Sequence, residues 1–163
     1  MVGRVWLIKV EGKPIPAPRV TRQDKWKPRP RVQAYHQWRD KVALASKTTL
    51  RGVNLPFQFP VRLSFRFGLA GKKPRCDIDN LIKGVKDALV RAGVLRDDTV
   101  REVPAYGSAV VEFLCRNCPR DRDGRIRRYS DAPTCPGISN CPYEFAIIKI
   151  EEITDPNYQW GDL

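Results

Sequence analysis

The sequence predicts an α+β fold, in which a mixed β-sheet carries two helices in the order β-α-β-α-β-β and the final hairpin is enlarged by a cysteine-rich insert. Three observations support this fold class. Several segments alternate apolar and polar residues, as half-buried strands do, and two others repeat apolar residues every three or four positions, as helices do. The length of 163 residues suits one core, so we expect residues 1–163 to form a single domain.

The first third of the chain predicts a strand, an arm and a helix. Val2–Val10 is rich in β-forming residues and ends at Glu11-Gly12. Residues 12–31 contain five prolines among many cations, and because Pro blocks helix interiors and central strands, we expect a loop or arm there. Gln33–Lys47 lacks Gly and Pro, and its apolar residues recur at helical spacing, at Tyr35, Trp38, Val42 and Ala45.

The rest of the chain predicts one more helix and three more strands. Phe57–Phe67 has the clearest alternation of apolar and polar residues, and Val100–Leu114 and Tyr143–Ile153 are also strand-like. Asn80–Ala92 places its apolar residues on one arc at about 3.6 residues per turn. Gly93 follows at the position where a helix commonly ends, so this helix is the most strongly indicated element.

Charge is distributed unevenly along the chain. Residues 1–75 hold 18 Lys and Arg against 3 Asp and Glu, whereas residues 76–163 hold 12 against 15. A basic half joined to an acidic half is typical of a protein that binds a polyanion and also holds a cation. No segment has the apolar length of a signal peptide or membrane helix, so we expect a soluble, cytoplasmic protein. No Ser-His-Asp set, P-loop or dinucleotide-binding fingerprint is present in the sequence.

Three carboxylates are candidates for a metal site. Asp77 and Asp79 lie two residues apart at the start of the second helix, and in an extended segment both would point to the same side. Two acids on one side repel each other unless a cation lies between them. Asp98 can just return to this point if the chain reverses at Gly93, because six residues span at most about 20 Å and the helix is about 18 Å long. Oxygen ligands of this kind suit Mg²⁺ or Mn²⁺.

Lys83 lies one turn into the helix, where its charge could stabilise a transition state or position a scissile phosphate. Asp87, four residues further on, has a structural interpretation as the ion-pair partner of Lys83. The acids at the helix start also have a structural interpretation, since the helix dipole favours acids there, and Asp97-Asp98 would then be a turn. Spacing alone does not decide between the two interpretations.

This stretch resembles the RusA family of Holliday-junction resolvases and phage RusA-like endonucleases. The match runs in one register over Asp77-x-Asp79-Asn80-Leu81, Lys83, Asp87-Ala88-Leu89, Ala92-Gly93 and Asp97-Asp98. The resemblance implies a metal-dependent endodeoxyribonuclease in which Asp77, Asp79 and Asp98 bind the catalytic Mg²⁺ and Lys83 assists. It also implies a homodimer that cuts four-way DNA junctions by paired incisions, as in recombination and repair.

The resemblance extends to the basic segment GKPIPAPR after the first strand. With the last strands, it covers most of the chain outside Cys115–Cys141. One departure is Cys76, which stands where family members commonly have a basic residue. We expect Arg75 to provide that phosphate contact instead.

The insert Cys115–Cys141 is polar and holds four of the five cysteines, namely Cys115, Cys118, Cys135 and Cys141. The first pair has the C-x₂-C spacing of zinc ribbons, and so polar a segment needs a staple such as a metal to fold. We therefore predict a structural Zn²⁺ site in a knuckle that enlarges the turn between the last two strands. The alternatives are free cysteines in a mobile loop or an Fe–S cluster. A site closed by four thiolates should not catalyse.

The proline-rich arm predicts the DNA contact. Its candidate DNA-binding residues are Arg19, Arg22, Lys25, Trp26, Lys27, Arg29 and Arg31. Cations contact phosphates without reading sequence, and an aromatic ring can stack on an unpaired base at a junction centre. We therefore expect DNA affinity to fall steeply as salt is added.

Together these features predict Mg²⁺-dependent hydrolysis of branched DNA, with water as the nucleophile. Two other functions remain open. One is a non-catalytic, zinc-containing protein of the same fold that binds nucleic acid. The other is an RNA nuclease that uses the same carboxylates.

Overall fold

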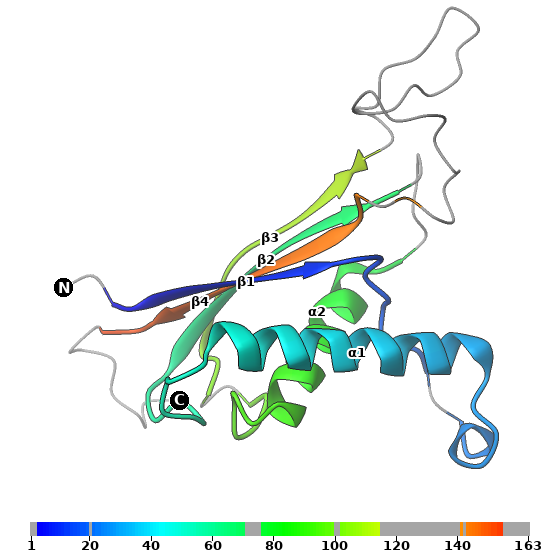
Figure 1. Ribbon diagram of the computed structural model, residues 1–163, viewed down its shortest axis with the longest axis horizontal. Coiled ribbons are helices and arrows are strands. Elements are labelled where there is room, and N and C mark those ends of the chain that lie inside the picture. The colour runs from blue at the N-terminus through cyan, green and yellow to red at the C-terminus, as the bar shows by residue number, and fades with distance from the viewer. Residues whose placement is uncertain are drawn as a thin grey trace, which may run out of the picture.

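The computed structural model describes residues 3–19, 21–70, 76–99, 102–114, 141 and 143–154. Strands and helices follow one another in the predicted order (Figure 1). The elements are β1 (Val5–Glu11), a short 3₁₀ helix η1 (Gln23–Lys25), α1 (Pro30–Thr49), β2 (Val61–Leu69), α2 (Ile78–Arg91), β3 (Ala105–Phe113) and β4 (Phe145–Glu152).

The four strands form one mixed sheet in the order β1-β4-β2-β3. β4 runs antiparallel to both of its neighbours, whereas β2 and β3 are parallel and are joined through α2. The predicted α+β class, with a mixed sheet and two helices, is confirmed. The predicted hairpin of the last two strands is wrong, because β4 does not pair with β3 but lies between β1 and β2. Its residues Ala146, Ile148 and Ile150 are fully buried, and a central position provides the cover that they need.

Both helices lie on the same side of the sheet (Figure 1). The core forms between them and the inward-facing residues of the strands, which include Ile8, Leu63, Phe67 and Ile148. On α1, buried residues recur every three or four positions, at Val32, Tyr35, Trp38, Val42 and Ser46. Neither described helix is long and apolar enough to cross a membrane.

No helix of the described residues covers the opposite face of the sheet (Figure 1). Alternate residues of each strand point to this face, and two ion pairs lie on it. Arg66–Glu112 joins β2 to β3, and Lys149–Glu151 lies within β4. Val5, Leu7 and Val110 are exposed on the same face. The described part of the sheet therefore has one packed face and one of mixed polarity.

Two predicted boundaries shift at prolines. The predicted strand Phe57–Phe67 begins only at Val61, because Pro60 has no N–H to join the sheet, and Phe57 is buried in the loop before it. The first helix begins at Pro30 rather than Gln33. Pro is well tolerated at the first helical position, where its missing N–H is not needed, so the C-terminal end of the predicted arm is in fact helix.

Candidate active site

The helix α2 positions most of the predicted catalytic residues. It was predicted over Asn80–Ala92 and is observed over Ile78–Arg91, and Gly93 with φ of 71° ends it in the left-handed conformation that glycine tolerates best. Its buried face consists of Leu81, Val85, Ala88 and Leu89. Its face toward α1 carries Gly84, Asp87 and Arg91. By helical spacing, Asp79, Lys83 and Lys86 share the remaining, outward face.

Asp77 and Asp79 are both exposed at the N-terminal end of α2. Asp77 occupies the N-cap position with an extended backbone, yet its carboxylate makes no capping hydrogen bond to the helix. Among the described residues, its carboxylate accepts one long side-chain hydrogen bond, 3.4 Å from the amide nitrogen of Asn80. The expected extended geometry of residues 77–79 is wrong because the helix begins at Ile78. The two acids are neighbours at a helix entrance rather than alternate residues of a strand.

Asp98 returns toward these acids but stops short of them. Its carboxylate lies 3.4 Å from the ammonium group of Lys86, which is seven residues after Asp79. At 1.5 Å per residue, that is about 10 Å along the helix axis. The ammonium group also lies 5.7 Å from the centre of the Tyr106 ring on β3. The chain therefore reverses at Gly93 as predicted, but it brings Asp98 only to the middle of α2.

Lys86 is a polar residue that the sequence analysis did not single out. Burial acts to lower its pKa, but a hydrogen bond to Tyr106 and the charge of Asp98 outweigh this effect and raise it. Lys86 therefore stays protonated, although only 15% of its side chain is exposed. Its spacing from Asp79 and Lys83 was the signal that could have identified it.

Asp87 has a different partner from the one predicted. Its carboxylate accepts a hydrogen bond of 2.7 Å from the Tyr35 hydroxyl on α1, instead of pairing with Lys83. Burial, together with this hydrogen bond, raises the pKa of Tyr35. Lys83 is exposed on the outward face. Asp87 thus joins the two helices, and Lys83 remains oriented toward solvent on the same face as Asp79.

The acids at the start of α2 have the donor type that suits a hard divalent cation. Within the described ranges, no three Asp, Glu, His or Cys side chains lie together as a metal-binding group. Mg²⁺ is, however, commonly held by one or two carboxylates together with waters and substrate phosphates. Asp77 and Asp79 fit this mode of binding, whereas Asp98 would first have to leave Lys86.

Two cations act electrostatically on Cys76, the residue before the acids at the start of α2. Burial and the charge of Asp77 raise the pKa of the Cys76 thiol, while the charges of Arg31 and Lys13 oppose this shift. Those effects require both cations to lie near Cys76, although Lys13 is 63 residues away in the sequence. The chain therefore brings positive charge to the point where the sequence motif has lost its basic residue.

The proline-rich segment packs directly on α2. The backbone N–H of Ala17 donates to the carbonyl of Asn80 at 2.9 Å. Gly84 allows this close approach, because a Cβ atom there would lie 3.2 Å from the Tyr35 ring and 3.5 Å from the Ile15 carbonyl oxygen. The arm is thus attached to the helix that carries the acids.

Glu144 is a buried carboxylate beside the C-terminal end of β2, the strand that leads to α2. It is 3% exposed and accepts a hydrogen bond of 2.9 Å from the N–H of Ala70, the last described residue before Cys76. Burial raises the pKa of Glu144, and the charge of Lys13 opposes the shift. The sequence analysis missed it, although it shares the period-two phase of Ala146 and Ile148, which predicts an inward side chain.

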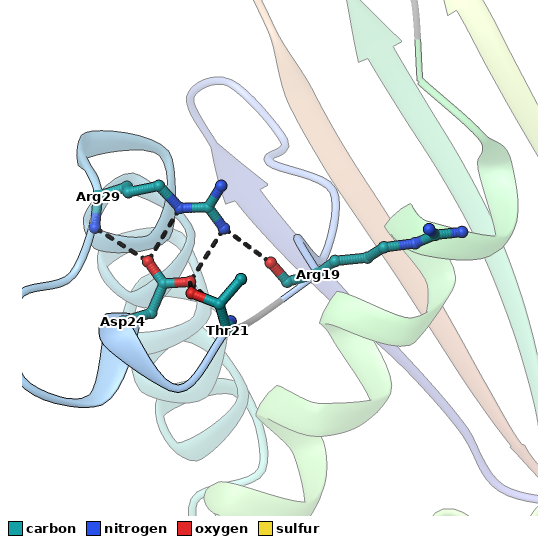
Figure 2. A network of polar contacts seen from close by, with 4 residues as sticks. All are labelled: Arg19, Thr21, Asp24 and Arg29. Atoms are coloured by element: carbon teal, nitrogen blue, oxygen red, sulfur yellow. Dashed lines mark hydrogen bonds and ion pairs between the residues drawn. The ribbon is translucent and has the colours of Figure 1, made fainter.

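A cluster of hydrogen bonds orders the predicted basic arm. Asp24 is its centre and is only 5% exposed. Its carboxylate accepts hydrogen bonds from the Arg29 guanidinium and from both the backbone and the hydroxyl of Thr21, and Arg29 also donates to the carbonyl of Arg19 (Figure 2). These bonds, led by those of Arg29, hold the pKa of Asp24 well below its usual range. We call this cluster the Asp24 clamp.

We predict that Asp24→Ala will loosen the loop that the clamp closes. Without the carboxylate, Arg29 and Thr21 lose their shared acceptor, so the bonds after Arg22 and Lys25 should be cut several-fold faster by trypsin under native conditions. The measurement is the rate of limited digestion, with the cut sites identified by mass spectrometry. Asp40→Ala, which removes only an exposed ion pair with Arg91, is the matched control and should leave the rate unchanged. Equal rates for wild type and Asp24→Ala would contradict this account of the loop.

The predicted site residues therefore fall into four groups. Asp77, Asp79 and Lys83 are exposed within the first two turns of α2, whereas Asp98 pairs with Lys86. The candidate DNA-binding residues of the arm are exposed, and Arg29 is also part of the clamp. Arg75, Cys115, Cys118 and Cys135 lie outside the described residues, while Cys141 is partly buried just before β4.

Comparison with known proteins identifies the family. No curated protein matches the chain. The family model of endodeoxyribonuclease RusA matches residues 11–112. This range contains the arm, the clamp, both helices and all three acids, and it ends before the cysteine-rich insert. The chain belongs to the RusA family of endodeoxyribonucleases.

Proposed function

We propose that the protein is a Mg²⁺-dependent endonuclease that resolves Holliday junctions and other branched DNA. The observation that carries this proposal is the state of Asp77, which stands at the N-cap of α2 without capping it. A purely structural acid would be expected to bond the free N–H groups of the first turn. An exposed carboxylate that does not do so, with Asp79 two residues on, is available to a metal ion.

The residues around α2 have distinct proposed roles in hydrolysis. Bound at Asp77 and Asp79, Mg²⁺ would polarise the phosphodiester and activate a water. Lys83, on the outward face, stabilises the charge that develops on the phosphoryl oxygens. Lys13 and Arg31, close to Cys76, hold the DNA backbone by its phosphates. Asp98 completes the acid set if its side chain exchanges Lys86 for the metal.

We propose that the active protein is a homodimer, since a four-way junction offers two equivalent strands to cut. The sheet face that no described helix covers offers such a dimer a surface of mixed polarity, on which Val5, Leu7 and Val110 are exposed. One active site per subunit would then make the two incisions. Sedimentation equilibrium should give twice the mass of the chain.

A panel of substrates tests the proposed function. Labelled four-way junction, linear duplex, flap and RNA are each incubated with Mg²⁺ and with EDTA. We expect paired, symmetric nicks in the junction, weaker cutting of the flap, and no product from duplex, from RNA or with EDTA. Cleavage of RNA would favour a ribonuclease, and the absence of cleavage with any divalent ion would favour a binding protein.

We also propose a structural Zn²⁺ in the cysteine-rich insert, held by Cys115, Cys118, Cys135 and Cys141. We predict about one tightly bound zinc per chain in protein purified without oxygen, as structural zinc sites retain their metal. Elemental analysis after extensive dialysis measures it. Cys118→Ser should lower the zinc content, whereas Cys76→Ser, which lies outside the insert, should not. Zinc-free wild-type protein would contradict this proposal.

A further inference from the structure

The loop closed by the Asp24 clamp presents one large aromatic side chain to solvent. Trp26 is 91% exposed, more than any other exposed large hydrophobic residue of the described chain. In the lower right of Figure 1, this blue loop projects beyond the N-terminal end of α1. An indole normally buries a large area in a folded protein, so its presentation at an ordered tip indicates a contact made with a partner.

The backbone on both sides of Trp26 is fixed. The N–H groups of Trp26 and Lys27 both donate to the carbonyl of Gln23, at 3.1 and 2.9 Å. The buried carboxylate of Asp24 holds the base of the same turn through Arg29 and Thr21. Because the loop is already ordered, binding through Trp26 costs less conformational entropy than binding through a mobile segment.

A hollow beside the indole is lined by three ring-bearing and three polar side chains. Its lining residues are Gln23, Trp26, Lys27, Pro28, Arg29 and Pro30. The indole and the two proline rings provide apolar surface for a planar group, and the Gln23 amide can donate to and accept from its edge. Lys27 and Arg29 add positive charge to the lining, and the charge of Arg29 is shared with Asp24. A planar, hydrogen-bonding group that is attached to an anion matches this combination.

The charges around the hollow also favour a planar group attached to an anion. Asp24 is the one acid between residues 12 and 39, and its charge is already matched by Arg29. Arg22, Lys25 and Lys27 are exposed around the tip. An apolar peptide would leave these cations without partners, whereas a nucleic acid strand supplies a base for the rings and phosphates for the cations.

We propose that the hollow formed by Trp26, Pro28 and Pro30 binds a single unstacked nucleobase of the DNA. The assignment rests on the proposed function only for the source of that base, which is the branch point where pairing is interrupted. The arm before the loop is hydrogen-bonded to the acidic helix, since the N–H of Ala17 donates to the Asn80 carbonyl at 2.9 Å. Trp26 follows Ala17 by nine positions, at most about 32 Å of chain. One DNA molecule can therefore reach both the base site and the carboxylates.

Binding to a duplex with one extrahelical base tests the proposal without cleavage. The full-length protein is titrated in EDTA with perfect duplex, with the bulged duplex, and with the same bulge carrying an abasic site. We expect wild type to prefer the base-containing bulge over both others by about tenfold or more, the range of one base stacked on an aromatic ring. Trp26→Ala should lose this preference and Trp26→Phe should keep most of it.

The double variant Arg22→Ala/Lys25→Ala, which changes two exposed cations that do not line the hollow, is the matched control. It should weaken binding to all three DNAs and flatten the salt dependence by about two phosphate contacts, while it keeps the preference for the base. Trp26 is exposed, so its replacement should not alter the fold. An unchanged preference in Trp26→Ala, or equal binding of the abasic bulge, overturns the proposal. A clear preference for the base in a protein that cuts no branched DNA supports the base site and refutes the proposed function.

Discussion

Asp77→Asn and Asp79→Asn should each lower the rate of junction cleavage by at least about 100-fold while binding to the junction persists. The substitution keeps the size of the side chain but removes the negative charge, and a metal ion in such a site contributes several kcal/mol to transition-state stabilisation. Neither acid is buried, and neither caps α2 through its side chain in the described hydrogen bonds. Single-turnover cleavage and gel-shift affinity in Ca²⁺ or EDTA separate catalysis from binding.

Asp87→Asn is the matched control on the same helix. Its carboxylate is used by Tyr35, so the loss of charge should lower the free energy of unfolding by about 1 kcal/mol and leave cleavage within a few-fold of wild type. Asp98→Asn distinguishes two states of the third acid. Loss of cleavage would mean that Asp98 leaves Lys86 during the reaction. Full cleavage by Asp77→Asn and Asp79→Asn together would remove both residues from the mechanism.

The parts of the site that could be predicted from sequence are those that depend on one element. The apolar period of α2 and the glycine at its end predict the helix, and the helix then places Asp79 and Lys83 on one face. The position of Asp98 could not be obtained in this way. The reach of the chain permitted a return to Asp79, but the ion pair with Lys86 and the packing of Tyr106 set where it stops.

Long-range pairings account for the other differences. Because β3 and β4 are consecutive in the sequence, a hairpin between them was expected. The inward residues of β4 are fully buried, however, and β4 lies between β1 and β2 in the sheet. The proline-rich arm was correctly predicted as basic and, apart from η1 and its last two residues, as irregular. Its loop is held in place by Asp24, which accepts five hydrogen bonds from Thr21 and Arg29. These bonds form only in the folded turn, and no local sequence pattern predicts them.

Leu89→Ala should lower the free energy of unfolding by about 2–5 kcal/mol, because deleting a fully buried leucine loses its transfer free energy and leaves a cavity. Leu44, a leucine on α1 that is 68% exposed, is the matched control, and Leu44→Ala should stay within about 0.5 kcal/mol of wild type. Urea denaturation measures both. Leu89 lies ten residues beyond Asp79, about 15 Å along α2, so the cleavage rate per folded molecule should not change at temperatures where the variant is folded. A parallel loss of stability and of that rate would mean that the packing of α2, as well as its carboxylates, sets the catalytic geometry.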